Sequence, residues 1–231
     1  MKIEPNELKG TKKDIYSHLW GNKELDFQVQ LTGKTDLSYE MLISKDIVDM
    51  VGKQIAENFN LACDDFFKSK FTQACSGSGD EIKKIATLHS SSLCAFLFFY
   101  NVSEGKPLKL GNYKFTESFF EFKNKVIGYP SNVDVVLVGT EKMTGRKVLL
   151  FLESKFSEYI TGITKGGNKF EIGKSYFTKE PSKSIYEHFS ELGINRIEQS
   201  NCLTCPEDCY IEGLKQMVSH YFGLCNFVDG D

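Results

Sequence analysis

The sequence predicts an α/β protein, in which a mixed β-sheet is flanked by helices and preceded by a mainly helical N-terminal extension. Three observations support this prediction. Apolar residues recur at helical spacing between residues 44 and 100, β-prone runs follow between residues 113 and 152, and residues 212–225 form an amphipathic segment. With 231 residues, 41% of them hydrophobic, the chain is long enough to bury a sizeable core.

The first helical region is expected over residues 44–75, as one long helix or as a helix pair. Ile47, Val51, Ile55 and Phe59 recur every four residues, the spacing of an apolar stripe on one helix face. A further single helix is expected over residues 80–100, and residues 212–225 predict the last helix.

A Gly-rich and Ser-rich segment, Cys75-Ser76-Gly77-Ser78-Gly79, separates the first two helical regions. Such composition is typical of a flexible break in the chain. The predicted domains are therefore a mainly helical extension, residues 1–76, and a core, residues 77–231.

The strongest strand pattern is a hairpin. Two apolar runs of β-branched and large residues, Val133–Val138 and Lys147–Leu152, flank a turn region over Gly139–Arg146. Residues 113–127, just before them, are rich in Phe and Tyr and are also β-prone. We therefore expect these runs to be neighbouring strands of one sheet.

Three charged residues interrupt the apolar hairpin. Asp134 lies near the start of its first strand, while Glu153 and Lys155 end its second. Because Glu153 and Lys155 are two residues apart, their side chains lie on the same face of an extended chain. A buried charge is costly unless it meets a partner or a metal. The alternative is an ordinary solvated Glu–Lys pair at the end of a strand.

The segments Pro130-Ser131-Asn132-Val133-Asp134 and Glu153-Ser154-Lys155 resemble the motif of the PD-(D/E)XK nuclease superfamily. The resemblance extends over about residues 114–159 and only loosely to the flanking helices. It implies that residues 77–231 hold a restriction-endonuclease-like core. It also implies a metal-dependent nuclease that hydrolyses phosphodiester bonds in nucleic acid, with DNA favoured over RNA.

The resemblance assigns roles to individual residues. Asp134, Glu153 and the backbone carbonyl of Ser154 would hold Mg²⁺, with Mn²⁺ as an alternative, because hard cations prefer oxygen ligands. Lys155 would orient the attacking water and stabilise charge that develops on the phosphate. Gln216, on the last helix, matches a Gln that reaches the site in related nucleases. A solvated helix face is the other explanation of Gln216.

Two further acids are candidates for the edge of this site. Glu121 precedes Asp134 by thirteen residues. It is either an additional catalytic acid or a charge on the exposed face of an edge strand. Some members of the superfamily carry an acid on the helix before the sheet, where Glu81 is the candidate.

A cysteine cluster suggests a second metal site. Cys202, Cys205 and Cys209 fall within eight residues at ligand-like spacing, and His220 or Cys225 are candidates for a fourth ligand. Some nucleases of the superfamily hold an iron–sulfur cluster, but here the three cysteines precede Gln216, which departs from their pattern. Zinc, an iron–sulfur cluster and no metal at all remain open, and a further alternative treats the cysteines as redox centres.

Composition and charge bound the function further. The longest apolar run, Leu93–Tyr100, is too short to span a membrane, and the N-terminus carries no apolar signal segment. We therefore expect a cytoplasmic protein whose seven cysteines are thiols or metal ligands, without a membrane partner. A homodimer, and a longer parent chain beyond Cys225, stay open.

The charge distribution is uneven. Residues 106–183 hold 14 Lys and Arg against 8 Asp and Glu, a net charge of +6; because the whole chain carries −3, the remainder carries −9. A locally basic region attracts a polyanion even within an acidic protein. The rival to a nuclease is a non-catalytic module that binds nucleic acid or a partner, retains the nuclease fold, and uses the cysteines as a structural metal site.

Overall fold

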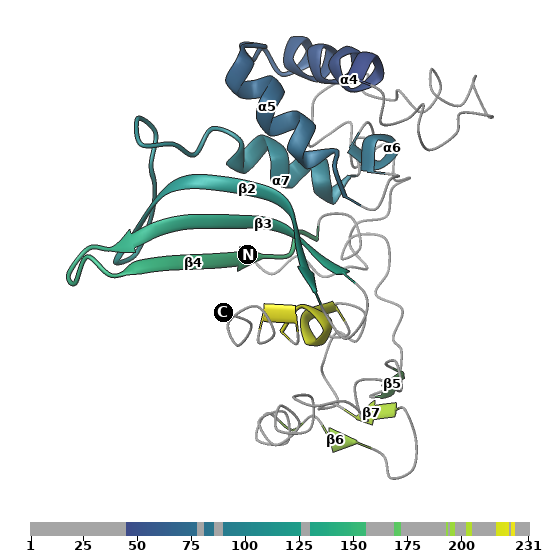
Figure 1. Ribbon diagram of the computed structural model, residues 1–231, viewed down its shortest axis with the longest axis vertical. Coiled ribbons are helices and arrows are strands. Elements are labelled where there is room, and N and C mark those ends of the chain that lie inside the picture. The colour runs from purple at the N-terminus through teal and green to yellow at the C-terminus, as the bar shows by residue number, and fades with distance from the viewer. Residues whose placement is uncertain are drawn as a thin grey trace, which may run out of the picture. The chain divides into compact units, whose positions relative to one another are not determined.

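A computed structural model describes part of the chain. The described residues are 45–77, 81–85, 90–125, 130–155, 169–171, 193, 195–196, 202–204, 216–221 and 223–224. Over these ranges the protein is mixed α/β, with helices packed against a four-stranded antiparallel sheet (Figure 1). None of the described helices has the length and the apolar character that crossing a membrane requires.

The first helical region is a helix pair, α4 (Lys45–Asn58) and α5 (Asp65–Ala74). Soon after α4, Asn60 adopts a φ of 54°, a conformation that helical residues do not have. Asp64 then caps α5, since its carboxylate accepts a hydrogen bond from the Phe67 backbone N–H at 2.8 Å. Because α4 and α5 are separate helices, the apolar residues of this region do not form one continuous stripe.

The next region differs from the prediction, because the expected single helix over residues 80–100 is wrong. The structure has two helices there, α6 (Glu81–Ile85) and α7 (Ser91–Phe99). Ser90 starts α7, since its hydroxyl oxygen accepts a hydrogen bond from the Leu93 backbone N–H at 3.0 Å. Serine is a poor residue inside a helix but a strong N-cap, which explains the division.

The sheet follows in the order β1-β2-β3-β4. Its strands are β1 (Leu108–Leu110), β2 (Tyr113–Lys125), β3 (Pro130–Glu141) and β4 (Lys147–Leu152). The predicted hairpin is confirmed, with β3 and β4 paired from Val135↔Leu152 to Thr140↔Lys147. The turns between β1 and β2 and between β3 and β4 each contain a glycine with positive φ, Gly111 (55°) and Gly145 (69°), the conformation that glycine adopts most easily.

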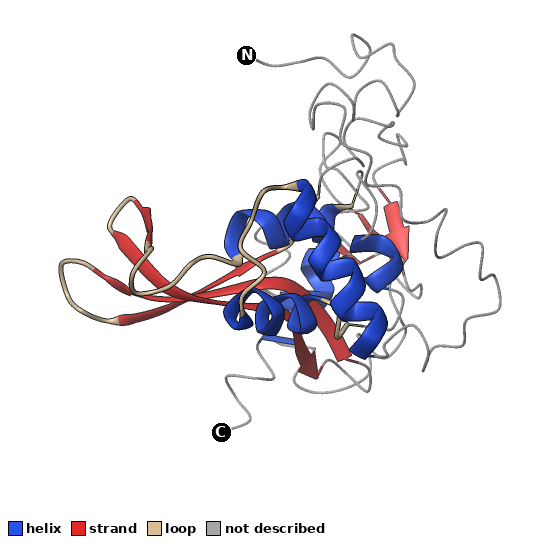
Figure 2. Ribbon diagram, turned by 90° about the horizontal axis from the view of Figure 1, so that it is seen from above, coloured by secondary structure: helices blue, strands red, loops and turns tan. Residues whose placement is uncertain are grey.

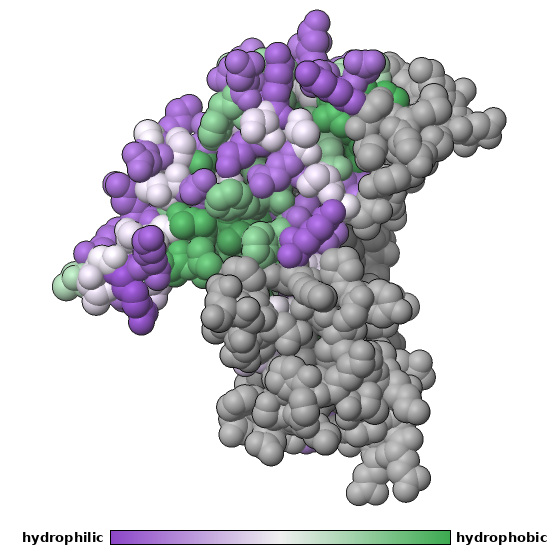
Figure 3. Space-filling model, viewed as in Figure 1, coloured by the Kyte–Doolittle hydropathy of each residue, from purple (hydrophilic) through white to green (hydrophobic). Residues whose placement is uncertain are grey.

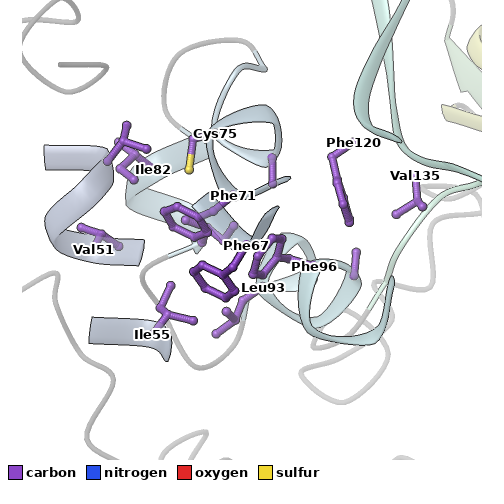
Figure 4. Close-up of a cluster of buried hydrophobic side chains, with 14 of the residues drawn as sticks. Val51, Ile55, Phe67, Phe71, Cys75, Ile82, Leu93, Phe96, Phe120 and Val135 are labelled. Atoms are coloured by element: carbon purple, nitrogen blue, oxygen red, sulfur yellow. The ribbon is translucent and has the colours of Figure 1, made fainter. Parts of the chain in front are cut away.

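The hydrophobic core lies between the helices and one face of the sheet (Figures 1 and 4). Phe96 of α7 is its centre, with ring centroids 5.3 Å from Phe67, 5.2 Å from Phe71 and 5.6 Å from Phe120. Edge-to-face and tilted ring pairs such as these add to the gain from burying apolar area. The core therefore joins α5 and α7 to β2.

The two faces of the β3–β4 hairpin differ. Val135 and Leu137 of β3 and Leu150 and Leu152 of β4 belong to the core. Side chains alternate along a strand, so Val136 and Val138 and their partners Phe151 and Leu149 lie on the opposite face, here called the outer face. Leu149 is 48% exposed there.

The chain forms two compact units, one of Met1–Phe122 with Val133–Gly162 and one of Lys123–Asn132 with Ile163–Asp231. The helices α4–α7 and most of the sheet belong to the first. The second has a small antiparallel sheet in the order β5-β7-β6, from β5 (Lys169–Glu171), β6 (Asn195–Arg196) and β7 (Cys202–Thr204). Within the expected last helix, residues 216–221 and 223–224 are helical.

The predicted boundary at residue 76 stays a prediction, but the expectation of a flexible break there needs correction. Cys75 and Gly77 are both buried, and Cys75 belongs to the hydrophobic core. The small residues at this point serve close packing.

Gly139 lies where β3 comes close to the backbone of β2. A Cβ at this position would lie 2.2 Å from the Lys114 carbonyl oxygen and 2.7 Å from the Phe115 Cα. These are backbone atoms of the neighbouring strand, which move only if the strands separate. Gly139→Ala should therefore lower the free energy of unfolding by about 2–3 kcal/mol in urea denaturation.

The matched control for this test is Gly105→Ala, because a Cβ at Gly105 meets no atom within 4 Å. Its unfolding free energy should stay within about 0.5 kcal/mol of wild type. Equal stability of the two variants would contradict the close approach of β2 and β3.

Candidate active site at the end of the β3–β4 hairpin

The hairpin brings two of the predicted acids to the same end. Its pairing ends at Val135↔Leu152, and Asp134 and Glu153 are the adjacent residues, one before Val135 and one after Leu152. Both acids therefore lie at the end of the hairpin away from its turn.

Ser154 connects this position to the helices. Its backbone N–H donates to Asp134 Oδ2 at 2.5 Å, and its hydroxyl donates to the Ser91 carbonyl oxygen at 2.9 Å. Ser91 is the first residue of α7. The segment after β4 is thus bound to β3 through the Asp134 carboxylate and to α7 through the Ser91 carbonyl.

Lys155 forms an ion pair with Glu153, with 2.5 Å between Lys155 Nζ and Glu153 Oε1. The Glu153 side chain is only 9% exposed, while that of Lys155 is 28% exposed. A hydrogen bond between two charged groups is shorter and stronger than a neutral one, and partial burial reduces its screening by water. The pair gives the nearly buried Glu153 carboxylate a cationic neighbour.

Glu121 belongs to a second acidic group, around Gly77. A Cβ added to Gly77 would lie 2.5 Å from Glu121 Oε2 and 2.5 Å from Glu81 Cδ, so both side chains approach this glycine closely. Glu81 and Glu121 are 4% and 9% exposed. Burial, and then the charges of Glu121 and Glu81, raise the pKa of the Cys75 thiol well above its usual range.

The backbone of Glu121 is also unusual, with a φ of 49° inside strand β2. A non-glycine residue in this conformation costs about 1–2 kcal/mol. The alternative of a charge on the exposed face of an edge strand is wrong, because Glu121 is buried. Sequence reasoning named Glu81 and Glu121 but missed that they meet at Gly77.

The remaining candidates lie in the second unit. Gln216 is helical and exposed. His220 is buried, and its Nδ1 is 2.5 Å from the Ser131 hydroxyl oxygen. Ser131 lies at the start of β3, in the segment that precedes Asp134. The structure thus assigns His220 a hydrogen bond that sequence reasoning did not anticipate.

The cysteine cluster is described only in part. Cys202 begins β7, where it pairs with Glu171, while Cys205, Cys209 and Cys225 lie outside the described residues. Within the described ranges, no three His, Cys, Asp or Glu side chains lie close enough together to hold a metal ion. The Asp134–Glu153 pair contains two such side chains, with the Ser154 backbone beside them.

No protein-family model matches the chain, and no curated protein and no solved structure is significantly similar to it.

The Ser154 hydroxyl provides a test of how the site is attached to the helices. Ser154→Ala removes the hydrogen bond to Ser91 and should lower the free energy of unfolding by about 1 kcal/mol. Ser91→Ala is the matched control. It removes a hydroxyl from the other residue of this hydrogen bond but leaves the Ser91 backbone carbonyl, which is the acceptor. Chemical denaturation measures both. A Ser91→Ala variant as unstable as Ser154→Ala would show that the hydroxyl–carbonyl bond is not the cause.

Proposed function

We propose that the protein is a metal-dependent nuclease that hydrolyses phosphodiester bonds in nucleic acid. The observation that carries this proposal is the position of Asp134 and Glu153 at the same end of the β3–β4 hairpin, with Lys155 paired to Glu153. Two acids and a lysine at one strand end are the residue types that metal-assisted phosphate hydrolysis uses.

The residues present fit a hard divalent cation. Two carboxylates at the same end of a hairpin repel each other when they lie close together, and a cation between them would relieve that repulsion. Carboxylate and carbonyl oxygens are the ligands that Mg²⁺ and Mn²⁺ prefer, so Asp134, Glu153 and the Ser154 carbonyl would hold the ion. When bound, such an ion supplies a Lewis acid for the phosphate and lowers the pKa of a bound water.

The protein's own contribution is positioning and charge. The bonds of Ser154 to Asp134 and Ser91 restrict the segment that carries Glu153 and Lys155. The Lys155 ammonium is partly exposed and lies beside Glu153. In the proposed reaction it would orient water and stabilise negative charge on a phosphate. Preorganised charges of this kind act without reorganising during the reaction.

The finer fold is part of the proposal. A helix, α7, precedes the antiparallel strands β2, β3 and β4, and the motif acids lie on β3 and just after β4. This order is what a restriction-endonuclease-like core would require. The assignment rests on the motif resemblance together with the placement of Asp134 and Glu153.

Cleavage of supercoiled plasmid, linear duplex and single-stranded DNA tests the proposal. With Mg²⁺ or Mn²⁺ we expect cleavage by the wild type and none in EDTA. Lys155→Ala should reduce the rate by about 10²–10³-fold, since the group that stabilises transition-state charge is lost. Glu153→Gln, which removes a charged metal ligand and keeps its shape, should reduce the rate similarly.

Lys53→Ala is the control for charge, because Lys53 is an exposed lysine of α4 with a side chain 71% exposed. It should cleave at the wild-type rate. Folded wild-type protein that cleaves none of the substrates would refute the nuclease and favour the non-catalytic binding module. A Lys155→Ala variant with unchanged activity would place the chemistry elsewhere.

A further inference from the structure

The turn end of the sheet carries a dense positive charge. Residues 106–116 and 139–149, here called the basic arm, hold six Lys and Arg and one Glu, a net charge of +5. All six basic residues are exposed, namely Lys106, Lys109, Lys114, Lys142, Arg146 and Lys147. Figure 2 shows the hairpins projecting beyond the helices, and Figure 3 shows mainly hydrophilic residues over this end.

The single acid of the basic arm is engaged locally. Glu141 Oε2 accepts a hydrogen bond from the Thr144 hydroxyl at 2.6 Å and lies 3.9 Å from an Arg146 nitrogen. Its side chain is only 22% exposed, against 72% for Arg146. The solvent therefore meets mainly the cations of the arm.

The arm is braced between its two turns. The Lys142 backbone N–H donates to the Asn112 carbonyl oxygen at 2.8 Å, and the Lys142 ammonium donates to the Gly111 carbonyl oxygen at 2.7 Å. These bonds join the β3–β4 turn to the β1–β2 turn. The two turns of the arm are thus fixed to each other, which lowers the entropy cost of binding a partner.

Two lysines of the arm oppose each other. Lys109 of β1 pairs directly with Lys114 of β2. Like charges at directly opposite positions destabilise a sheet. A bound polyanion would remove this repulsion, so the pair costs stability in the free protein and favours an anionic partner.

Three lysines of the arm share one face of the sheet. Leu108 and Tyr113 pack against the core, so Lys109 and Lys114, the alternate residues, lie on the outer face. Lys147 pairs with Thr140 on that same face, as the alternation with Val148 shows.

The shape of the arm suits DNA, because its hairpins project beyond the helices (Figure 2). The major groove of B-form DNA admits a two-stranded β-ribbon, whereas the major groove of A-form RNA is too narrow for side chains to read.

We propose that the basic arm lies along the major groove of duplex DNA and binds the phosphates that border it. The choice of nucleic acid as the polyanion rests on the proposed function. Leu110 and Met143, 55% and 84% exposed, lie at the two turns and add apolar contact at the tip.

The test is binding of a fluorescently labelled duplex DNA in EDTA, where cleavage plays no part. The arm variant Lys109→Gln, Lys114→Gln and Lys147→Gln should bind about tenfold more weakly or worse. Its salt dependence should fall by about 2–3 in the slope of log K against log salt. Its melting temperature should equal or exceed that of wild type, because the Lys109–Lys114 repulsion is gone.

The matched control removes three exposed lysines of α4 and α5, as Lys45→Gln, Lys53→Gln and Lys68→Gln. The net charge changes equally, so only the location differs. The control should bind within about threefold of wild type. Equal weakening of both variants, or wild-type binding by the arm variant, would overturn the proposal.

Further ligands separate the other outcomes. Duplex RNA bound as tightly as duplex DNA would overturn the groove argument, and vesicles of anionic lipid bound in preference to DNA would make the arm a membrane surface. DNA binding that depends on the arm, without any cleavage, would refute the proposed nuclease and keep this inference. Wild-type cleavage and wild-type binding by the arm variant would refute this inference and keep the proposed nuclease.

Discussion

The register of the β3–β4 hairpin is the constraint on which the rest depends. A shift of one residue would turn Val135, Leu137, Leu150 and Leu152 away from the helices, at the cost of the apolar burial that holds the core. The same register brings Asp134 and Glu153 to one end of the hairpin. The hydrophobic side chains that fix the register thereby position the charged residues at that end.

The core extends this constraint into the helices. Phe96 packs against Phe67 and Phe71 of α5 and against Phe120 of β2. The helix that carries Phe96 begins at Ser91, whose carbonyl accepts the Ser154 hydroxyl. Ser154, between Glu153 and Lys155, is therefore anchored to α7, whose Phe96 is fully buried in the core, and this supports the candidate site.

Some of this could be predicted from the sequence, because its signals are local. Apolar runs and the turn residues indicated the hairpin, and the two-residue spacing of Glu153 and Lys155 indicated their common side. Other features needed tertiary contacts. Ser90 was expected inside a helix because capping depends on where a helix begins, and Gly77 was expected in a flexible break because composition does not show that two carboxylates surround it. The Ser131–His220 bond joins residues far apart in the chain, so spacing could not reveal it.

The proposed function requires that Asp134 and Glu153 together hold a divalent cation. Titration of Mn²⁺, followed by the electron paramagnetic resonance signal of the free ion, tests this without any substrate. We expect saturable binding by the wild type and binding weakened by about tenfold or more in Asp134→Asn, which keeps the side-chain shape and removes the charge. Equal binding by the two proteins, or no binding by a folded wild type, would exclude this metal site.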